Sequence, residues 1–173
     1  MQRHIRTRLV TATAAVLVAA GTITAGVSTA EPEHTKTTAT RSAKPTKAQI
    51  AALFDGWNAA LQTGDPDKVA DRYAKDAVLL PTLSAEIRTD RAGIVDYFVG
   101  FLAKKPVGVK VRTVINVLDE NSAIDTGLYE FHLTDPVTGA KSTAEARYTY
   151  EYEKRGGKWL IVNHHSSLLP TES

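Results

Sequence analysis

Cysteine is absent from this sequence of 173 residues. The chain therefore has no disulfide bond to stabilise it and no cysteine to which a lipid could be attached. The chain also lacks a marked excess of positive or negative charge, because it has 21 basic and 19 acidic residues. Without a basic excess, we expect no nucleic-acid partner. The hydrophobic share of 43% is ordinary for a globular chain and is enough for one domain with its own core.

Acidic residues are missing from the first 30 positions, where three arginines precede an apolar run over residues 9–27. This order, followed by Ser28-Thr29-Ala30, is typical of a secretory signal peptide and predicts cleavage after Ala30. The alternative is a retained membrane anchor, since about 20 apolar residues span a bilayer. The run is only weakly hydrophobic, which favours the signal peptide. We therefore expect a secreted protein without a stable anchor, whose mature chain has 18 basic and 19 acidic residues.

Apolar residues are scarce in residues 31–45, so this stretch is predicted to be a disordered linker. Residues 46–173 form the single predicted domain. Its start is marked by Thr46 and Gln49, which have the spacing of a capping box. Apolar residues at three- and four-residue spacing then predict a long amphipathic helix that ends near Gly64.

Two shorter helices are predicted after the first. Asp65-Pro66 supplies the N-cap acid and first-turn proline of a helix that we extend to about Tyr73. Thr89-Asp90 caps another helix, which ends before Pro106. Between them, residues 77–81 predict a brief strand that pairs with residues 86–88 as a small hairpin.

Beyond Pro106 the hydrophobic pattern becomes alternating. Four long strands are predicted, over residues 107–118, 123–134, 141–153 and 158–166. Their separators are short and rich in turn-forming residues, so neighbouring strands should run antiparallel. Helices followed by a meander of strands predict an α+β fold, in which three N-terminal helices pack against one face of a mostly antiparallel sheet.

The tripeptide Asp125-Thr126-Gly127 is the first of three features that we considered for chemistry. It carries the catalytic aspartate in aspartic proteases, which need two carboxylates and so would require a homodimer here. The tripeptide lies inside a predicted strand and not in a loop. Because a motif this short arises easily by chance, a protease is not favoured.

The adjacent histidines His164 and His165 are the second feature. Neighbours on a strand point to opposite faces, so the two rings cannot bind one metal or act on one substrate together. At most one of them faces the interior. There it is either a hydrogen-bonded structural residue or, with an ordinary pKa of about 6.5, a group that transfers protons.

The third feature is the alternation of Tyr148, Tyr150 and Tyr152 on one face of a strand. Aromatic residues in this pattern either pair across strands to stabilise the sheet or offer a hydroxyl that orients a ligand. On the neighbouring strand, Asp125 shares a face with Tyr129. An acid buried unpaired among apolar neighbours has a raised pKa, which makes Asp125 our preferred general base.

Both ends of the domain resemble a known group of proteins. The start resembles the first helix of the nuclear transport factor two-like, or SnoaL-like, superfamily in the pattern Ile50-x-x-Leu53-Phe54-x-x-Trp57-Asn58-Ala59-Ala60-Leu61-x-x-Gly64-Asp65. The end is similar to the association (hub) domain of calcium/calmodulin-dependent protein kinase II in the pattern Gly157-Lys158-Trp159-x-Ile161-Val162-x-x-His165-x-Ser167. The resemblance covers about residues 46–170 and extends to stand-alone bacterial proteins of this type.

The resemblance implies a cone, in which a strongly curved sheet wraps around the long helix and leaves a cavity at its wide end. It also implies self-association through the sheet. The kinase hub lines its cavity with arginines, whereas Tyr129, Tyr150 and Ser166 stand at the corresponding places here. This departure argues against binding of an acidic ligand in the hub manner, unless another arginine such as Arg147 compensates. No kinase domain is present, so we expect neither kinase activity nor calmodulin binding.

These observations predict a secreted, small-molecule-binding domain that forms a homodimer or higher homo-oligomer and takes an apolar or weakly acidic ligand. The residues predicted to line its pocket are Trp57, Tyr129, Arg147, Tyr148, Tyr150 and Ser166. One alternative is an acid-base enzyme of the isomerase, cyclase or dehydratase type. It would use Asp125, His165 or His164, without a metal or cofactor. A second alternative is a module that serves only for oligomerisation.

Overall fold

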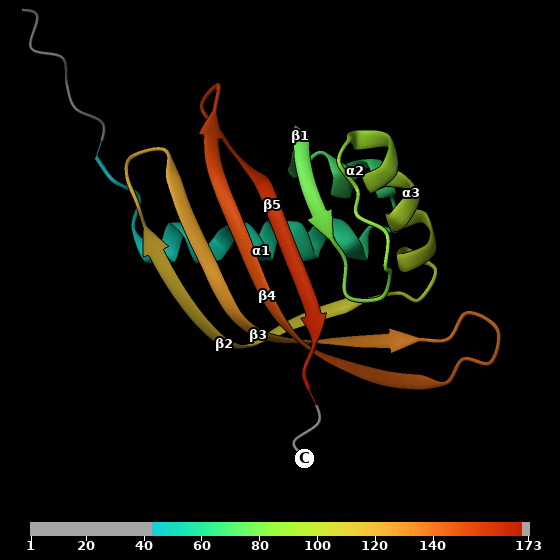
Figure 1. Cartoon of the computed structure of the whole chain (residues 1–173). Helices are drawn as coiled ribbons and strands as arrows, with labels where there is room; N and C mark the ends of the chain where they lie inside the picture. Colours follow the sequence, from blue (N-terminus) through green and yellow to red (C-terminus); the bar gives the residue numbers. More distant parts are fainter. Residues whose placement is uncertain (1–42, 171–173) are drawn as a thin grey trace, which may run out of the picture. The chain divides into compact units, whose positions relative to one another are not determined.

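The computed structural model describes residues 43–170, so the predicted signal peptide and most of the predicted linker lie outside the described residues. Within this range the chain forms three helices and one five-stranded sheet (Figure 1). In chain order the elements are α1 (Lys47–Gln62), α2 (Pro66–Ala70), β1 (Tyr73–Leu80), α3 (Arg91–Leu102), β2 (Val107–Val117), β3 (Ser122–Thr134), β4 (Lys141–Arg155) and β5 (Lys158–Leu168).

The sheet has the strand order β1-β5-β4-β3-β2. Neighbouring strands from β2 to β5 are antiparallel, whereas β1 runs parallel to β5 at one edge. The strands curve in front of α1 in Figure 1. This is the predicted α+β fold, with helices packed against a strongly curved and mostly antiparallel sheet.

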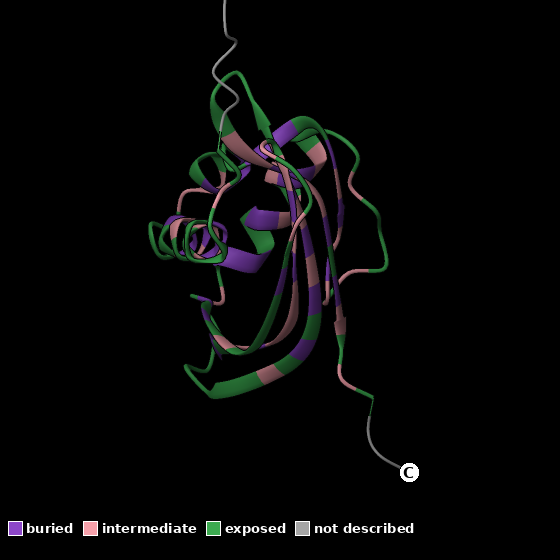
Figure 2. Ribbon diagram, turned by 90° about the vertical axis from the view of Figure 1, so that its left-hand side faces the viewer, coloured by how far each residue is buried: buried purple, intermediate pink, exposed green. Residues whose placement is uncertain are grey.

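The long helix α1 begins as its capping box predicts. The Thr46 hydroxyl accepts the Gln49 backbone N–H at 3.2 Å, and the Gln49 side chain accepts the Thr46 N–H at 2.8 Å. Ile50, Phe54 and Trp57 form the buried stripe of this helix. Figure 2 shows buried residues gathered between the helices and the strands. We call the sheet face toward α1 the inner face and the opposite one the outer face.

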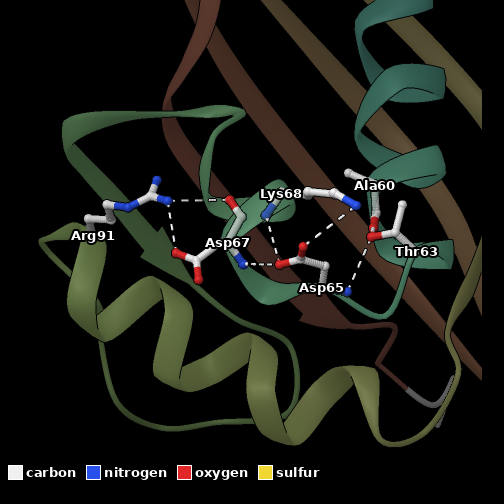
Figure 3. Close-up of polar contacts among 6 residues, drawn as sticks. All are labelled: Ala60, Thr63, Asp65, Asp67, Lys68 and Arg91. Atoms are coloured by element: carbon white, nitrogen blue, oxygen red, sulfur yellow. Dashed lines mark hydrogen bonds and ion pairs between the residues drawn. The ribbon is translucent and has the colours of Figure 1, made fainter.

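A compact turn joins α1 to α2 (Figure 3). The Thr63 hydroxyl donates to the Ala60 carbonyl at 2.7 Å and so closes the end of α1. Asp65 then caps α2 by accepting the Asp67 N–H at 3.0 Å. Arg91, the first residue of α3, binds the Asp67 carboxylate at 2.9 Å, which fixes α3 beside α2.

Two predicted boundaries near this turn were wrong. The second helix ends at Ala70 and not near Tyr73, and the strand that was predicted from residue 77 already begins at Tyr73. Tyr73 is a strand residue because it pairs with Ile161 of β5 and buries its ring. Ile161 is distant from Tyr73 in sequence, so no local pattern could predict this pairing. The predicted pairing of residues 86–88 is present as one antiparallel bridge between Leu79 and Arg88.

A bulge in β5 decides which side chains reach the inner face. Glu151 of β4 is opposite Asn163, but Tyr152 is opposite Ile161, so Val162 is an extra residue in β5. Ile161 therefore faces inward, and after the bulge His164 faces inward as well. Without the bulge, strict alternation from Ile161 would turn His165 toward the core in place of His164.

The Asp125-Thr126-Gly127 tripeptide also has a structural explanation. A second bulge, in β2, brings the Arg112 backbone close to Gly127. A Cβ atom on residue 127 would lie 1.8 Å from the Arg112 carbonyl oxygen and 3.1 Å from the Tyr148 hydroxyl. Glycine is therefore required at this position by the close approach of two backbones.

We predict that Gly127→Ala lowers the free energy of unfolding by about 1–3 kcal/mol, because the added methyl group must displace backbone atoms. Urea unfolding followed by circular dichroism measures the loss. The matched control is Gly100→Ala in α3, where a Cβ meets nothing within 4 Å. It should leave stability unchanged or raise it by up to about 1 kcal/mol. Wild-type stability of Gly127→Ala would contradict this description of the bulge.

Candidate functional site

Two polar clusters lie on the inner face of the sheet, on either side of a tyrosine. Asp125 of β3, Tyr150 of β4 and His164 of β5 are register neighbours, and all three are buried. The Tyr150 ring stacks on the imidazole with 4.0 Å between ring centroids. The two groups predicted as proton-transfer candidates are thus on strands separated by β4, and each has its own hydrogen-bond partners.

The first cluster surrounds Asp125. Lys110 of β2 places its Nζ 2.5 Å from Asp125 Oδ2, and the Tyr148 hydroxyl donates to Oδ1 at 3.0 Å. Thr113 lies 3.1 Å from the same hydroxyl. The Lys110 ammonium also lies 4.7 Å from the centroid of the Phe54 ring, at the edge of α1.

These contacts change the role that the sequence suggested for Asp125. Its side chain is fully buried, as the prediction requires, but it is paired with a cation. The preference for Asp125 as a general base rested on an unpaired carboxylate, and that premise does not hold. Removing Lys110 would leave a buried charge without its partner, at a cost of about 3–5 kcal/mol. The cluster therefore links β2, β3 and β4 through contacts that need both charges to be present.

The second cluster is a chain of hydrogen bonds through His164. The Trp57 indole N–H, which only donates, binds the Tyr73 hydroxyl at 3.1 Å. Tyr73 in turn donates to His164 Nδ1 at 2.9 Å. We assign the proton of the neutral ring to Nε2, which lies 3.4 Å from the Tyr129 hydroxyl. Tyr129 donates to Ser166 Oγ at 2.5 Å.

The chain continues outward from Ser166 to the Thr82 hydroxyl, which is partly exposed. Burial, with a smaller contribution from the neighbouring His165, lowers the pKa of His164 to about 3. The imidazole is therefore neutral at physiological pH. Burial raises the pKa of both Tyr73 and Tyr129, so their hydroxyls remain protonated donors.

A small cavity lies beside this chain of hydrogen bonds. Its volume is about 10 Å³, which is space for about one water molecule. The residues that line it are Trp57, Leu79, Pro81, Thr82, Tyr97, Phe98, Phe101, Tyr129, Phe131, His164 and Ser166. No arginine or lysine is among them. The interior of the cone, at this point, is filled by aromatic side chains.

Of the six predicted pocket residues, the structure places Trp57, Tyr129 and Ser166 at this cavity. Tyr148 belongs instead to the Asp125 cluster. Tyr150 is buried between the two clusters, and its hydroxyl has no hydrogen-bond partner among the described residues.

Two candidates lie on the outer face and therefore not at the cavity. Arg147 alternates with the buried Ala146 and Tyr148, so its side chain is exposed on the opposite side of β4. His165 is exposed because the bulge in β5 turns its neighbour inward. The expected separation of the two histidines by strand geometry is thus present, and His164 is the inner one.

Four residues of the two clusters were missed by the sequence reasoning: Lys110, Thr113, Tyr73 and Thr82. Lys110 carries a signal, because a charged residue interrupts an apolar strand between Val109 and Val111. Tyr73 and Thr82 carry none, because their contacts depend on the parallel pairing of β1 with β5.

Neither a metal site nor a membrane span is evident in the described part of the chain. Within residues 43–170, no group of three or more histidine, aspartate or glutamate side chains is arranged to hold a metal ion. Over the same residues, no helix is both long enough and apolar enough to cross a membrane.

The fold is that of the nuclear transport factor two-like (NTF2-like) class. A Streptomyces avermitilis protein of the NTF2-like family is 12% identical with a TM-score of 0.64, over 72% of this chain and 97% of its own. A ketosteroid isomerase-like protein from Erwinia carotovora atroseptica is 16% identical with a TM-score of 0.60, over 72% of this chain and 96% of its own. At these identities the similarity shows the fold alone.

Residues 46–170 match the calcium/calmodulin dependent protein kinase II association domain, and the chain belongs to this family. A crystal structure from Xanthomonas campestris that is named for the same association domain is 56% identical. It has a TM-score of 0.71, over 75% of this chain and 94% of its own. No protein with a curated description is significantly similar in sequence. The resemblance seen at the two ends of the domain is thus confirmed.

The pKa of His164 predicts a pH dependence of stability. Because the pKa is about 3 in the folded chain and ordinarily about 6.5, the unfolded chain binds the extra proton between these values. The free energy of unfolding should therefore fall as the pH drops from about 6.5 toward 3, by at most about 1.4 kcal/mol per pH unit from this residue. Urea unfolding at pH 7, 5.5 and 4 measures the slope.

The adjacent histidine supplies the control for this experiment. His164→Gln should flatten the slope, whereas His165→Gln should retain it, because His165 is exposed. Equal slopes in the wild type and in His164→Gln would show that His164 is not held neutral by burial.

Proposed function

We propose that this protein is an exported, self-associating domain in which the outer face of the sheet packs against the same face of a second copy. The observation that carries the proposal is the outer face itself. Val109, Val111 and Val114 of β2 are 43%, 58% and 46% exposed, and Ile124 and Leu128 of β3 add half-buried apolar surface beside them. Apolar surface of this kind, rimmed by charges, is typical of a protein interface.

The outer face is also complementary to itself. Thr126 of β3 and Thr149 of β4 are register partners at its centre. We consider a two-fold axis that runs across the strands, from Thr126 to Thr149. On each strand, this axis sets a residue opposite the residue of the second copy that lies equally far from the threonine on its other side. Arg147 then meets Glu151 of the second copy. An axis in this position gives an isologous interface between two sheets packed face to face.

The same axis pairs apolar side chains on β3. Leu128 lies next to Arg147, and Ile124 lies next to Glu151 in the register of β3 and β4. Leu128 therefore meets Ile124 of the second copy while the charges meet on β4. An axis parallel to the strands would set Leu128 against the arginine instead, and the complementarity would be lost. Family membership supports the proposal, since the family is named for association.

A charge exchange tests this arrangement. We predict that Arg147→Glu and Glu151→Arg each weaken self-association at least tenfold, because each places like charges opposite each other. The double variant Arg147→Glu/Glu151→Arg should recover most of the association, since it restores the opposite charges. Sedimentation equilibrium of the mature protein measures the three dissociation constants.

A control variant on the same face, and two results that would contradict the proposal, complete this experiment. Glu145→Arg changes the same charge on β4, but the axis sets Glu145 opposite Glu153 of the second copy, so this variant removes a like-charge contact and should not weaken association. A monomeric wild type at 100 μM would refute self-association. An oligomer that none of these variants weakens would place the interface elsewhere on the domain.

As a second candidate function, we propose that the cavity beside His164 takes a small uncharged ligand. The observation behind it is the convergence of His164, Tyr129 and Ser166 on the same apolar space. No cation lines the cavity, and burying an unpaired anion is costly. The ligand must displace the rings of Tyr97 or Phe101, because only about 10 Å³ is empty.

Catalysis is less well supported than binding. Asp125 is occupied by Lys110, and His164, with a pKa of about 3, is a weak proton acceptor at neutral pH. The carboxylate of the first cluster is therefore held by a cation, and the imidazole of the second is a poor base.

Thermal-shift measurements test the cavity. We predict that phenol raises the melting temperature of the Phe101→Ala variant, whose cavity is enlarged, more than that of the wild type. Benzoate at pH 7 should not stabilise either protein, because its charge finds no partner there. Stabilisation by benzoate equal to that by phenol, or no stabilisation of the enlarged variant by phenol, would refute this proposal.

A further inference from the structure

A groove follows α1 on the side of the domain where β5 begins. It consists of two hollows of about 610 Å³ and 400 Å³, and Trp159 lines both of them. Leu53 and Ala60 of α1 form one wall of the larger hollow, and Leu160 continues the other wall beside Trp159. Leu53, Trp159 and Leu160 are half-buried, so the groove has an apolar floor that remains accessible.

The rim of this groove is predominantly basic. Lys68, Arg72 and Lys158 surround the larger hollow, and Lys44 and Lys154 surround the smaller one. The acids at the groove are Asp71 and Glu120. Asp71 is already bound to Arg91 of α3 at 2.8 Å. Five cations thus surround the groove beside two acids, whereas basic and acidic residues are nearly balanced in the whole chain.

The cations of the larger hollow are available to a partner. Within residues 43–170, neither Arg72 nor Lys158 makes an ion pair. The Arg72 guanidinium lies over Gly56, with Nη1 3.4 Å from the position of a Cβ there. Lys68 lies 3.6 Å from Asp65 at the start of α2, and both side chains are exposed (Figure 3). Such a surface pair contributes little and is easily exchanged.

From these observations we propose that the groove binds an extended acidic peptide segment of a partner protein. The groove follows α1 from Gln49 to Thr63, a length of about 21 Å at 1.5 Å per residue. About six residues of extended chain span this distance. Acidic side chains of the segment bind the cations on the rim, and one apolar side chain packs between Trp159 and Leu53. This surface is separate from the outer face that serves self-association.

Single-stranded nucleic acid is the other anionic polymer that such a rim could attract. Its binding sites stack successive bases on several aromatic side chains. Trp159 is the only aromatic residue that lines either hollow in the described part of the chain. The aliphatic floor beside it suits a leucine or isoleucine side chain better than a second base. The chemistry of the groove therefore favours a peptide.

Fluorescence anisotropy with the full chain and a fluorescein-labelled hexapeptide, Asp-Glu-Leu-Asp-Glu-Leu, tests the proposal. We expect saturable binding that weakens as salt is raised, and quenching of a tryptophan signal that the Trp159→Phe variant lacks. Arg72→Gln/Lys158→Gln should weaken binding at least tenfold. The matched control is Lys104→Gln/Lys141→Gln, which removes the same charge near the β3–β4 hairpin and should bind like the wild type.

Three outcomes would overturn the proposal. The first is the absence of saturable binding of the acidic peptide at 1 mM. The second is an equal loss of affinity in the groove variant and in the control variant, which would show only general charge attraction. The third is tighter binding of oligo(dT) than of the peptide, which would assign the groove to nucleic acid. All four substituted side chains lie on the surface or near it, and circular dichroism verifies that the variants are folded.

Discussion

The packing of α1 against one face of the sheet is the constraint on which the rest of the structure depends. The helix buries its apolar stripe through Phe54 and Trp57, and the aromatic residues of β3 and β4 close around them. Because strand residues alternate, the packing of α1 on one face decides whether a side chain of the sheet lies on the inner or the outer face. Those on the inner face become core, and those on the outer face remain at the surface.

Polar groups on the inner face are tolerated because each cluster is internally satisfied. Asp125 is neutralised by Lys110, and His164 is held neutral between two tyrosines. The hydroxyls of Tyr150 and Tyr152, which have no hydrogen-bond partner among the described residues, are the exceptions. An interior built in this way is suited to rigidity more than to proton transfer. The chain belongs to a family that is named for association, and the ketosteroid isomerase-like neighbour shows a shared fold alone.

The helices, four of the strands and the fold class could be predicted from the sequence because their signals are local. Thr46 and Asp90 cap helices, and glycine-rich or aspartate-rich turns separate the strands. What could not be predicted depends on distant partners. The parallel pairing of β1 with β5, the bulge at Val162 that selects His164, and the salt bridge of Lys110 to Asp125 are all set by tertiary contacts. The site was therefore predictable in its residue types but not in its grouping.

The central claim, that the outer face meets its own copy about the threonine pair, has a direct measurement. The chain contains no cysteine, so one introduced thiol reports only on its own surroundings. Under mild oxidation, Thr126→Cys should form a disulfide-linked dimer at micromolar concentration, since the two-fold axis brings the two copies of this position together. Asn121→Cys, exposed in the turn before β3, should remain monomeric on a non-reducing gel. Cross-linking of Asn121→Cys but not of Thr126→Cys would contradict the account.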